Sequence, residues 1–308
     1  MQPKSPEEET QFYLSGWTAI LDDLREDGDL YHYTDIGGLK GILDSRTLWC
    51  THARYLNDSS EYEHGLSEVR RLLLASADFW RSSPSRDHSN PDQDPQTFEG
   101  MAQVIDDAGL GSEDSVPLVT CLSKAPDTLS QWRGYGPRGG YCIKFDQDAL
   151  EADLKYVDDK GRDLHGIPKL NPVRYRSEDV YPGIMTAIQT HREQREYSLR
   201  EGTSGGHSQV ELLEGFISIA THLKHPSFFE EREHRLSVSM RESFYTPSKL
   251  GLVPRGRIGF DIGAVREIMV GPGENTTTRV NSLRRYLRTT GLEGRIDVTT
   301  SQIPYREP

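Results

Sequence analysis

Residues 31–34 (YHYT) combine side chains that can hold a sugar or a phosphate. Their aromatic and β-branched types predict a strand, in which successive side chains point to opposite faces. His32 and Thr34 would then share one face, and Tyr31 and Tyr33 the other. An imidazole beside a hydroxyl can hydrogen-bond a ribose or a phosphate. The structural alternative is a core histidine whose ring nitrogen bonds a backbone carbonyl.

Residues 231–235 (EREHR) place three charged groups at alternate positions. In a strand, Glu231, Glu233 and Arg235 would lie on one face. Two carboxylates and a guanidinium are costly to bury without a purpose. Arg235 would keep one carboxylate ionised while the other acts as a base or stabilises a cation. An exposed edge strand with cross-paired charges is the alternative, but the flanking residues 228–229 (FF) indicate a packed element and favour function.

A third motif, LNDxxE at 56–61, brings Asn57, Asp58 and Glu61 close together in the sequence. An Asn or Asp followed about three residues later by a Glu is typical of a helix N-terminus, and this alternative requires no chemistry. Asn57 and Asp58 are also candidates for binding a ligand, so both interpretations stay open.

A fourth motif follows Ser123 and contains Trp132 and Tyr135 in the sequence QWRGY. Aromatic side chains beside a glycine-rich turn can stack on a flat ring, and the backbone at 139–140 (GG) can approach a ligand closely. Core aromatics next to an ordinary hairpin turn are the alternative.

The composition of the 308-residue chain limits the classes of function. With 48 acidic and 36 basic residues the net charge is −12, which argues against tight non-specific binding to a nucleic-acid backbone but not against a local basic pocket. The three cysteines have no C-x-x-C spacing, so neither a disulfide framework nor a zinc site is expected. The sequence lacks P-loop, HExxH and GxSxG motifs. It also lacks a signal pattern and an apolar stretch of about 18 residues, so a cytoplasmic protein is expected.

Short strands and unevenly inserted helices surround these motifs and predict an α+β fold. An amphipathic helix over 11–27 would form most of an N-terminal helical extension at 1–29. Residues 30–306 are expected to form a single α+β domain. The segment 81–97 has three prolines and no large apolar residue, and this composition predicts a flexible insertion near it.

The motifs occur in one order: YHYT, LNDxxE, CLS with QWxxYG, GGYCIKFD, KHPxFxxExExR and a terminal SxIPYR. This set resembles the bacterial and phage-associated family called domain of unknown function 2971, over about residues 30–306. More distantly, it resembles the ADP-ribosyltransferase fold of the diphtheria-toxin or DNA-modifying type. That fold implies split mixed and antiparallel sheets with peripheral helices.

The second resemblance implies an enzyme that uses NAD as its substrate. Glu233 would stabilise the oxocarbenium ion, Glu231 would orient the acceptor, and Arg235 would bind the pyrophosphate or tune the two acids. No metal site is implied. The residues implied to bind NAD are His32, Tyr33, Thr34, Asn57, Asp58, Ser123, Trp132 and Tyr135.

The implied reaction is ADP-ribosyl transfer to an unidentified protein or nucleic acid, in conflict between bacteria and phages, or NAD hydrolysis when no acceptor is present. A protein partner or a homo-oligomer is compatible with the sequence. Two alternatives from other classes stay open. One is a non-catalytic module that senses a nucleotide or binds a partner. The other is a metal-dependent nuclease or phosphoesterase that uses Asp58, Glu61, Glu231 and Glu233.

Overall fold

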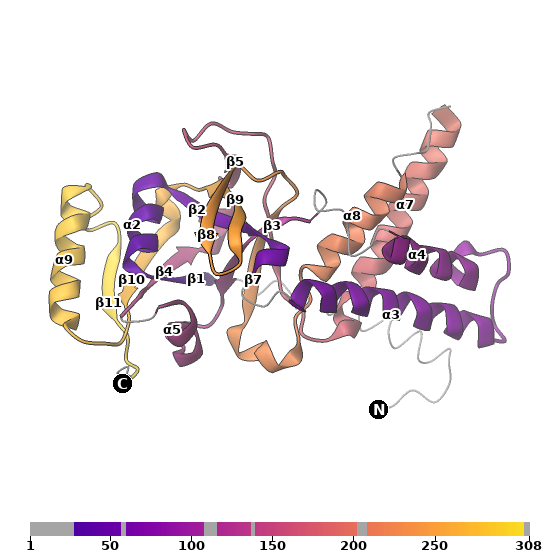
Figure 1. Cartoon of the computed structure of the whole chain (residues 1–308), viewed down its shortest axis with the longest axis horizontal. Helices are drawn as coiled ribbons and strands as arrows, with labels where there is room; N and C mark the ends of the chain where they lie inside the picture. The colour runs from indigo at the N-terminus through magenta and orange to yellow at the C-terminus, as the bar shows by residue number, and fades with distance from the viewer. Residues whose placement is uncertain (1–27, 57–59, 108–115, 137–138, 202–207, 305–308) are drawn as a thin grey trace. The chain divides into compact units, whose positions relative to one another are not determined.

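Two compact units make up the chain in the computed structural model (Figure 1). The structure describes residues 28–56, 60–107, 116–136, 139–201 and 208–304. The sheet unit takes its described residues from 27–55, 118–173 and 227–308, and the helical unit takes them from 56–117 and 174–226. The N-terminal helix expected over 11–27 lies outside the described residues. The single domain expected over 30–306 stays a prediction, because two compact units of one chain can still fold as one.

The sheet unit is a mixed sheet with helices at its sides. Its described strands are β1 (Asp29–Thr34), β2 (Thr47–His52), β3 (Leu118–Ser123), β4 (Tyr141–Asp146), β5 (Lys155–Val157), β6 (Lys169–Pro172), β7 (Glu233–Val238), β8 (Phe244–Ser248), β9 (Gly251–Gly259), β10 (Val265–Val270) and β11 (Asp297–Thr300). Its helices are α2 (Ile36–Ser45), α5 (Leu129–Tyr135), α6 (Gln147–Glu151) and α9 (Thr276–Thr289), with shorter turns η1 (Ala53–Tyr55), η6 (Pro226–Glu231) and η7 (Ile262–Ala264).

The strand order is β11-β10-β4-β1-β3-β2-β9-β5, with β7 paired to β3, β6 to β7 and β8 to β9. The β10–β11 pair is parallel and the other named pairs are antiparallel. A mixed sheet with unevenly inserted helices confirms the predicted α+β class. β3 is the strand that matters most for the site, because it pairs with β1, β2 and β7.

One face of this sheet packs into the main hydrophobic core. Leu30, Ile143 and Leu236 lie in this core with apolar residues of α2 and α9, and each fully buried Leu or Ile contributes about 1.5–3 kcal/mol. Asp35 caps the N-terminus of α2, because its carboxylate accepts a hydrogen bond of 2.7 Å from the backbone N–H of Gly38. α2 and α9 thereby cover one side of β1, β4 and β10.

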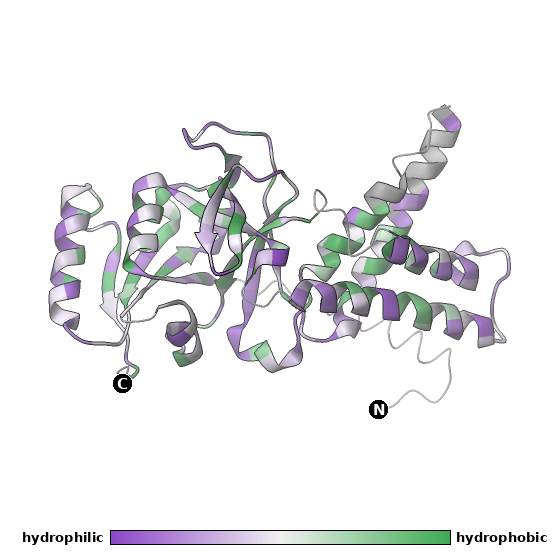
Figure 2. Cartoon of the chain, viewed as in Figure 1, coloured by the Kyte–Doolittle hydropathy of each residue, from purple (hydrophilic) through white to green (hydrophobic). Residues whose placement is uncertain are grey.

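The helical unit contains α3 (Ser60–Ser82), α4 (Pro95–Asp107), α7 (Tyr181–Glu201) and α8 (Ser208–Ala220), with the turns η2 (Pro91–Gln93) and η4 (Ser177–Val180). Buried Leu66, Val69 and Leu73 recur at helical spacing on α3. Figure 2 shows hydrophobic residues along α3 and α8. The two helices approach closely, because a Cβ atom at Gly65 would lie 2.2 Å from the backbone oxygen of Ala220.

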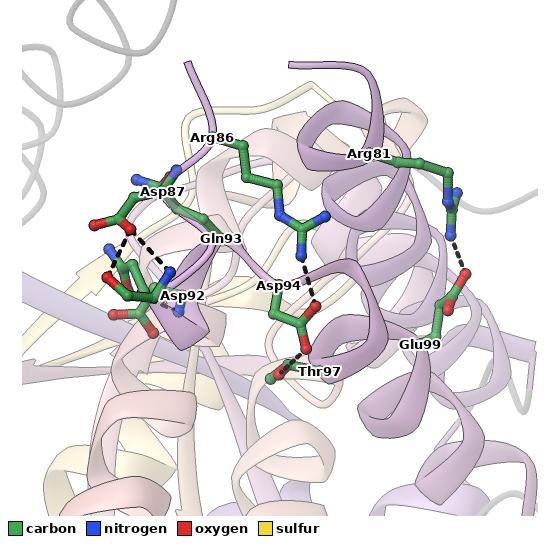
Figure 3. Close-up of polar contacts among 10 residues, drawn as sticks. Arg81, Arg86, Asp87, Asp92, Gln93, Asp94, Thr97 and Glu99 are labelled. Atoms are coloured by element: carbon green, nitrogen blue, oxygen red, sulfur yellow. Dashed lines mark hydrogen bonds and ion pairs between the residues drawn. The ribbon is translucent and has the colours of Figure 1, made fainter. Parts of the chain in front are cut away.

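The segment 81–97 contains a network of polar contacts (Figure 3). Arg86 Nη2 donates to Asp94 Oδ1 at 2.9 Å, and Arg81 pairs with Glu99. The backbone N–H of Asp92 donates to Asn90 Oδ1 at 2.9 Å and begins the turn η2. The flexibility expected of this segment from its composition stays a prediction, because contacts within one conformation do not measure motion. No helix in the described part of the chain is long and apolar enough to span a membrane.

Candidate functional site

Three neighbouring strands of the sheet unit align the best candidate residues. Tyr31 of β1 lies opposite Ser123 of β3, and Ser123 lies opposite Glu233 of β7. Directly paired residues of adjacent strands point to the same face of a sheet. Ser123 therefore lies between Tyr31 and Glu233 on one face of the sheet, and we take this β1–β3–β7 register as the centre of the candidate site.

Glu233 and Arg235 form a buried ion pair on that face. Arg235 Nε donates to Glu233 Oε1 at 2.7 Å, and Nη2 donates to Oε2 at 3.1 Å. Glu233 is 4% exposed and Arg235 is 2% exposed. Taking two charges out of water costs several kcal/mol for each ion, so the pairing is what makes the burial tolerable. The predicted proximity of these two residues is confirmed, and the guanidinium fixes the orientation of the carboxylate.

Glu231 does not share this strand, contrary to the prediction. It ends the turn η6, and β7 begins only at Glu233. The residue between them, Arg232, has a φ of 42°, which breaks the extended alternation. The backbone oxygen of Glu231 nevertheless accepts a 2.6 Å hydrogen bond from Ser123 Oγ. Ser123 thus holds the chain entering β7 against the end of β3.

His32 and Thr34 lie on the opposite face of β1 from Tyr31 and Tyr33, as predicted from the alternation. The paired residue of His32 is Ile143, which belongs to the main core. His32 Nδ1 donates to the backbone oxygen of Cys121 at 3.1 Å, as in the structural alternative, and burial lowers the pKa of the imidazole. His32 is therefore neutral near pH 7, and it lies across the sheet from Glu233 rather than beside it.

Tyr33 and Trp132 fill a small core under α5. Their rings meet edge to face with centroids 4.8 Å apart. The Tyr33 hydroxyl donates to the backbone oxygen of Ala125 at 2.8 Å, and Trp132 Nε1 donates to Asp127 Oδ1 at 2.8 Å. Trp132 is only 1% exposed. Both side chains hold α5 on the sheet, so stacking of Trp132 on a ligand ring, as the sequence suggested, is not available in this conformation.

Gly136 and Gly271 allow two chain segments to lie against Trp132. A Cβ atom at Gly271 would lie 2.6 Å from Trp132 Cζ3. The backbone N–H of Gly140 donates to the oxygen of Gly136 at 2.9 Å, and Arg279 donates to the oxygen of Gly140 at 2.7 Å. Glycines are needed at Gly136 and Gly271 because these two chain segments approach an indole ring, whereas the expectation that the backbone at 139–140 approaches a ligand stays a prediction.

Tyr31 and Tyr135 are two partly exposed aromatic residues on this face. Both pack against the core formed by Tyr33, Trp132 and Cys142. Burial raises the pKa of Tyr31, and the nearby Lys144 opposes that shift. Tyr31 belongs to the YHYT motif but was not among the residues expected to bind NAD, although the period-two pattern already placed it on the face of Tyr33. The aromatic positions suited to stacking on a ligand are therefore Tyr31 and Tyr135.

In the helical unit, Glu61 of the LNDxxE motif forms an ion pair with Lys224 of the KHP motif. Glu61 Oε1 lies 3.0 Å from Lys224 Nζ, and both side chains are buried. Asn57 and Asp58 lie outside the described residues, so their capping and ligand-binding predictions remain predictions. Within the described ranges, no cluster of three or more His, Cys, Asp or Glu side chains is arranged to hold a metal ion. No disulfide joins Cys50, Cys121 and Cys142, all of which lie within the described residues.

Comparison with known proteins adds one finding. Residues 131–236 match the family described as "Protein of unknown function (DUF2971)". The resemblance to this family that the ordered motifs indicated is confirmed over that stretch, which runs from α5 into β7 and includes Tyr135, Glu233 and Arg235. No curated protein and no solved structure matches the chain.

Proposed function

From this family resemblance and the β1–β3–β7 register, we propose that the protein binds NAD and cleaves the bond between nicotinamide and ribose. It transfers ADP-ribose to an acceptor, or to water when no acceptor is present. The observation that carries this proposal is the buried, orientated carboxylate of Glu233 in register with Ser123 and Tyr31. An ADP-ribosyltransferase-like arrangement of the sheet is part of the proposal.

Glu233 has the chemistry that this cleavage requires. When the C1′–N1 bond breaks, the electron pair leaves with nicotinamide and positive charge develops on the ribose. A fixed carboxylate in a site that excludes water stabilises that charge strongly. Arg235 holds the carboxylate in place and supplies a positive charge beside it, since its Nε lies 2.7 Å from Oε1. The oxygen or nitrogen of the acceptor then bonds to C1′ and releases a proton.

The remaining residues of the site have positioning or binding roles in this reaction. Tyr31 and Tyr135, as partly exposed aromatics on the Glu233 face, stack on nicotinamide. Glu231 lies next to the first residues of β7 and orients the acceptor. His32 bonds the backbone of β3 from the opposite face, so we assign it to holding β1 and β3 together rather than to the ribose.

Nicotinamide release tests the proposal. The wild-type protein is incubated with NAD, and free nicotinamide is measured by chromatography. Removing one electrostatic stabiliser of a transition state lowers kcat by about 10²–10³-fold, so Glu233→Gln is expected to lower the rate by about 100-fold or more. Glu293→Gln, which changes an exposed acid paired with Arg288, is the matched control and retains the rate. No release by the wild-type protein, together with no heat of NAD binding, would contradict the proposal.

One observation favours a second candidate, a non-catalytic nucleotide-binding module. Both carboxylate oxygens of Glu233 already accept hydrogen bonds from Arg235, which leaves fewer lone pairs for a ribose hydroxyl. For such a module, calorimetry would show NAD binding while nicotinamide release stays at the level without enzyme. The same pair of measurements therefore separates the two candidates.

A further inference from the structure

A cluster of two aromatic and two basic side chains lies on β2, β8 and β9. Trp49 pairs with Arg257 across β2 and β9, and Phe244 pairs with Arg255 across β8 and β9. The Trp49 and Phe244 rings lie 5.1 Å apart, with the Arg257 guanidinium 3.9 Å from the Phe244 centroid and the Arg255 guanidinium 6.0 Å from that of Trp49. Trp49, Phe244, Arg255 and Arg257 are called the stacking patch below.

Trp49 is unusually open for so large an apolar side chain. It is 52% exposed, whereas its neighbours Leu48 and Cys50 on the same strand are fully buried. An exposed indole ring can stack on the planar ring of a ligand, and a guanidinium group beside it adds a positive charge to the same surface. Single exposed hydrophobic residues are common, so the exposure of Trp49 alone does not indicate a binding site. The charges beside it supply the second argument.

The two guanidinium groups of the stacking patch lack acidic partners in the part of the chain that the structure describes. Arg255 donates to the hydroxyls of Thr246, at 2.7 Å, and Thr51, and Arg257 lies over Phe244. Burial lowers the pKa of Arg255, which shows that its desolvation is not offset by a carboxylate. An incoming anion would offset that cost, and the bidentate guanidinium geometry favours a phosphate.

We propose that the stacking patch binds a single-stranded nucleic acid. A base stacks on the exposed face of Trp49, and the adjoining phosphates lie against Arg257 and Arg255. One exposed aromatic platform with guanidinium groups beside it suits a strand whose bases are unpaired, which is how single strands are recognised. The net charge of −12 opposes long-range attraction, so the local arginines carry the contact. None of these four residues belongs to the set assigned to NAD, so this inference goes beyond the proposed function.

Fluorescence anisotropy with a labelled 12-nucleotide strand of thymidines, and with the matching strand of uridines, tests this binding. Base stacking on an aromatic side chain is worth about tenfold in affinity or more. Trp49→Ala is therefore expected to weaken binding about tenfold or more, and Trp49→Phe to retain most of it. For single strands, each phosphate contact contributes about −0.7 to the slope of log affinity against log salt, so Arg257→Gln is expected to reduce the slope by about that amount.

Controls keep the test specific. Arg288→Gln removes an exposed arginine that is paired with Glu293 and should leave binding unchanged, and circular dichroism verifies that each variant is folded. Glu233→Gln should bind the strand like the wild type, so failure of NAD cleavage and failure of this inference are distinguishable. No anisotropy change at 100-micromolar protein in low salt, equal affinity for duplex or free thymidine monophosphate, or unchanged binding by Trp49→Ala would each overturn the inference.

Discussion

At the residue scale, the buried Glu233–Arg235 ion pair loses the hydration of both charges, and its hydrogen bonds hold the two side chains in one geometry. Removing one member of a buried ion pair leaves an uncompensated charge and costs about 3–5 kcal/mol. Arg235→Met is therefore expected to lower the free energy of unfolding by about that amount in urea denaturation. The double variant with Glu233→Gln should recover much of the loss. An equal loss for Arg288→Met, which breaks an exposed pair with Glu293, would contradict this account.

His32 makes the free energy of unfolding depend on pH in a defined direction. Burial lowers its pKa below the ordinary value of 6.5, so the unfolded chain takes up the proton first as the pH falls. The stability from neutral His32 is complete well above pH 6.5 and decreases as the pH falls from there to the lowered pKa. His32→Gln cannot titrate and can still donate to Cys121. Its urea midpoint should fall less than that of the wild type between pH 7.5 and pH 5; equal falls would contradict this assignment.

At the scale of elements, local patterns predicted most of the strands and helices that carry the site. The period-two alternation of β1 and the Asp35 cap of α2 were both readable from a few adjacent residues. No motif of the sequence indicates the strands β5 and β8, which are short and pair with β9. Glu231 was misplaced because the left-handed Arg232 ends the alternation, and nothing in the residue type signals that conformation.

Close packing of α3 on α8 is another property of the elements, and two glycines test it. A Cβ atom at Gly65 would meet the backbone of Ala220, whereas one at Gly100 on α4 would have nothing within 4 Å. Gly65→Ala is expected to destabilise the protein by about 1–3 kcal/mol through overpacking. Gly100→Ala should instead stabilise it by up to about 1 kcal/mol through helix propensity. Thermal unfolding of the two variants measures both effects. A change in stability of the same sign in both variants would contradict the close packing of α3 on α8.

At the scale of the whole molecule, the candidate site depends on contacts between distant parts of the chain. Tyr31, Ser123 and Glu233 are brought into register by strand pairing, which no local pattern specifies. The sequence therefore predicted which residues of one strand share a face, but not which strands are neighbours. For the same reason His32 and Trp132 were assigned to the ligand, although the sheet places the first across from Glu233 and the second is buried between α5 and the sheet.

The proposed reaction also differs from the metal-dependent alternative in a measurable way. Nicotinamide leaves NAD as a neutral molecule from a cationic ring, so the departure requires no Lewis acid. Excess EDTA is therefore expected to leave nicotinamide release by the whole protein unchanged within about twofold. Loss of activity that added Mg²⁺ or Mn²⁺ restores would instead favour a metal-assisted mechanism.

The location of bound NAD tests the central claim most directly. A crystal structure of the Glu233→Gln protein soaked with NAD should retain the uncleaved dinucleotide, because the stabilising carboxylate is absent. We expect the nicotinamide ring against Tyr31 or Tyr135 and the adjoining ribose within hydrogen-bond distance of residue 233. NAD bound on the His32 face of the sheet, or bound only in the helical unit, would contradict the assignment of this site.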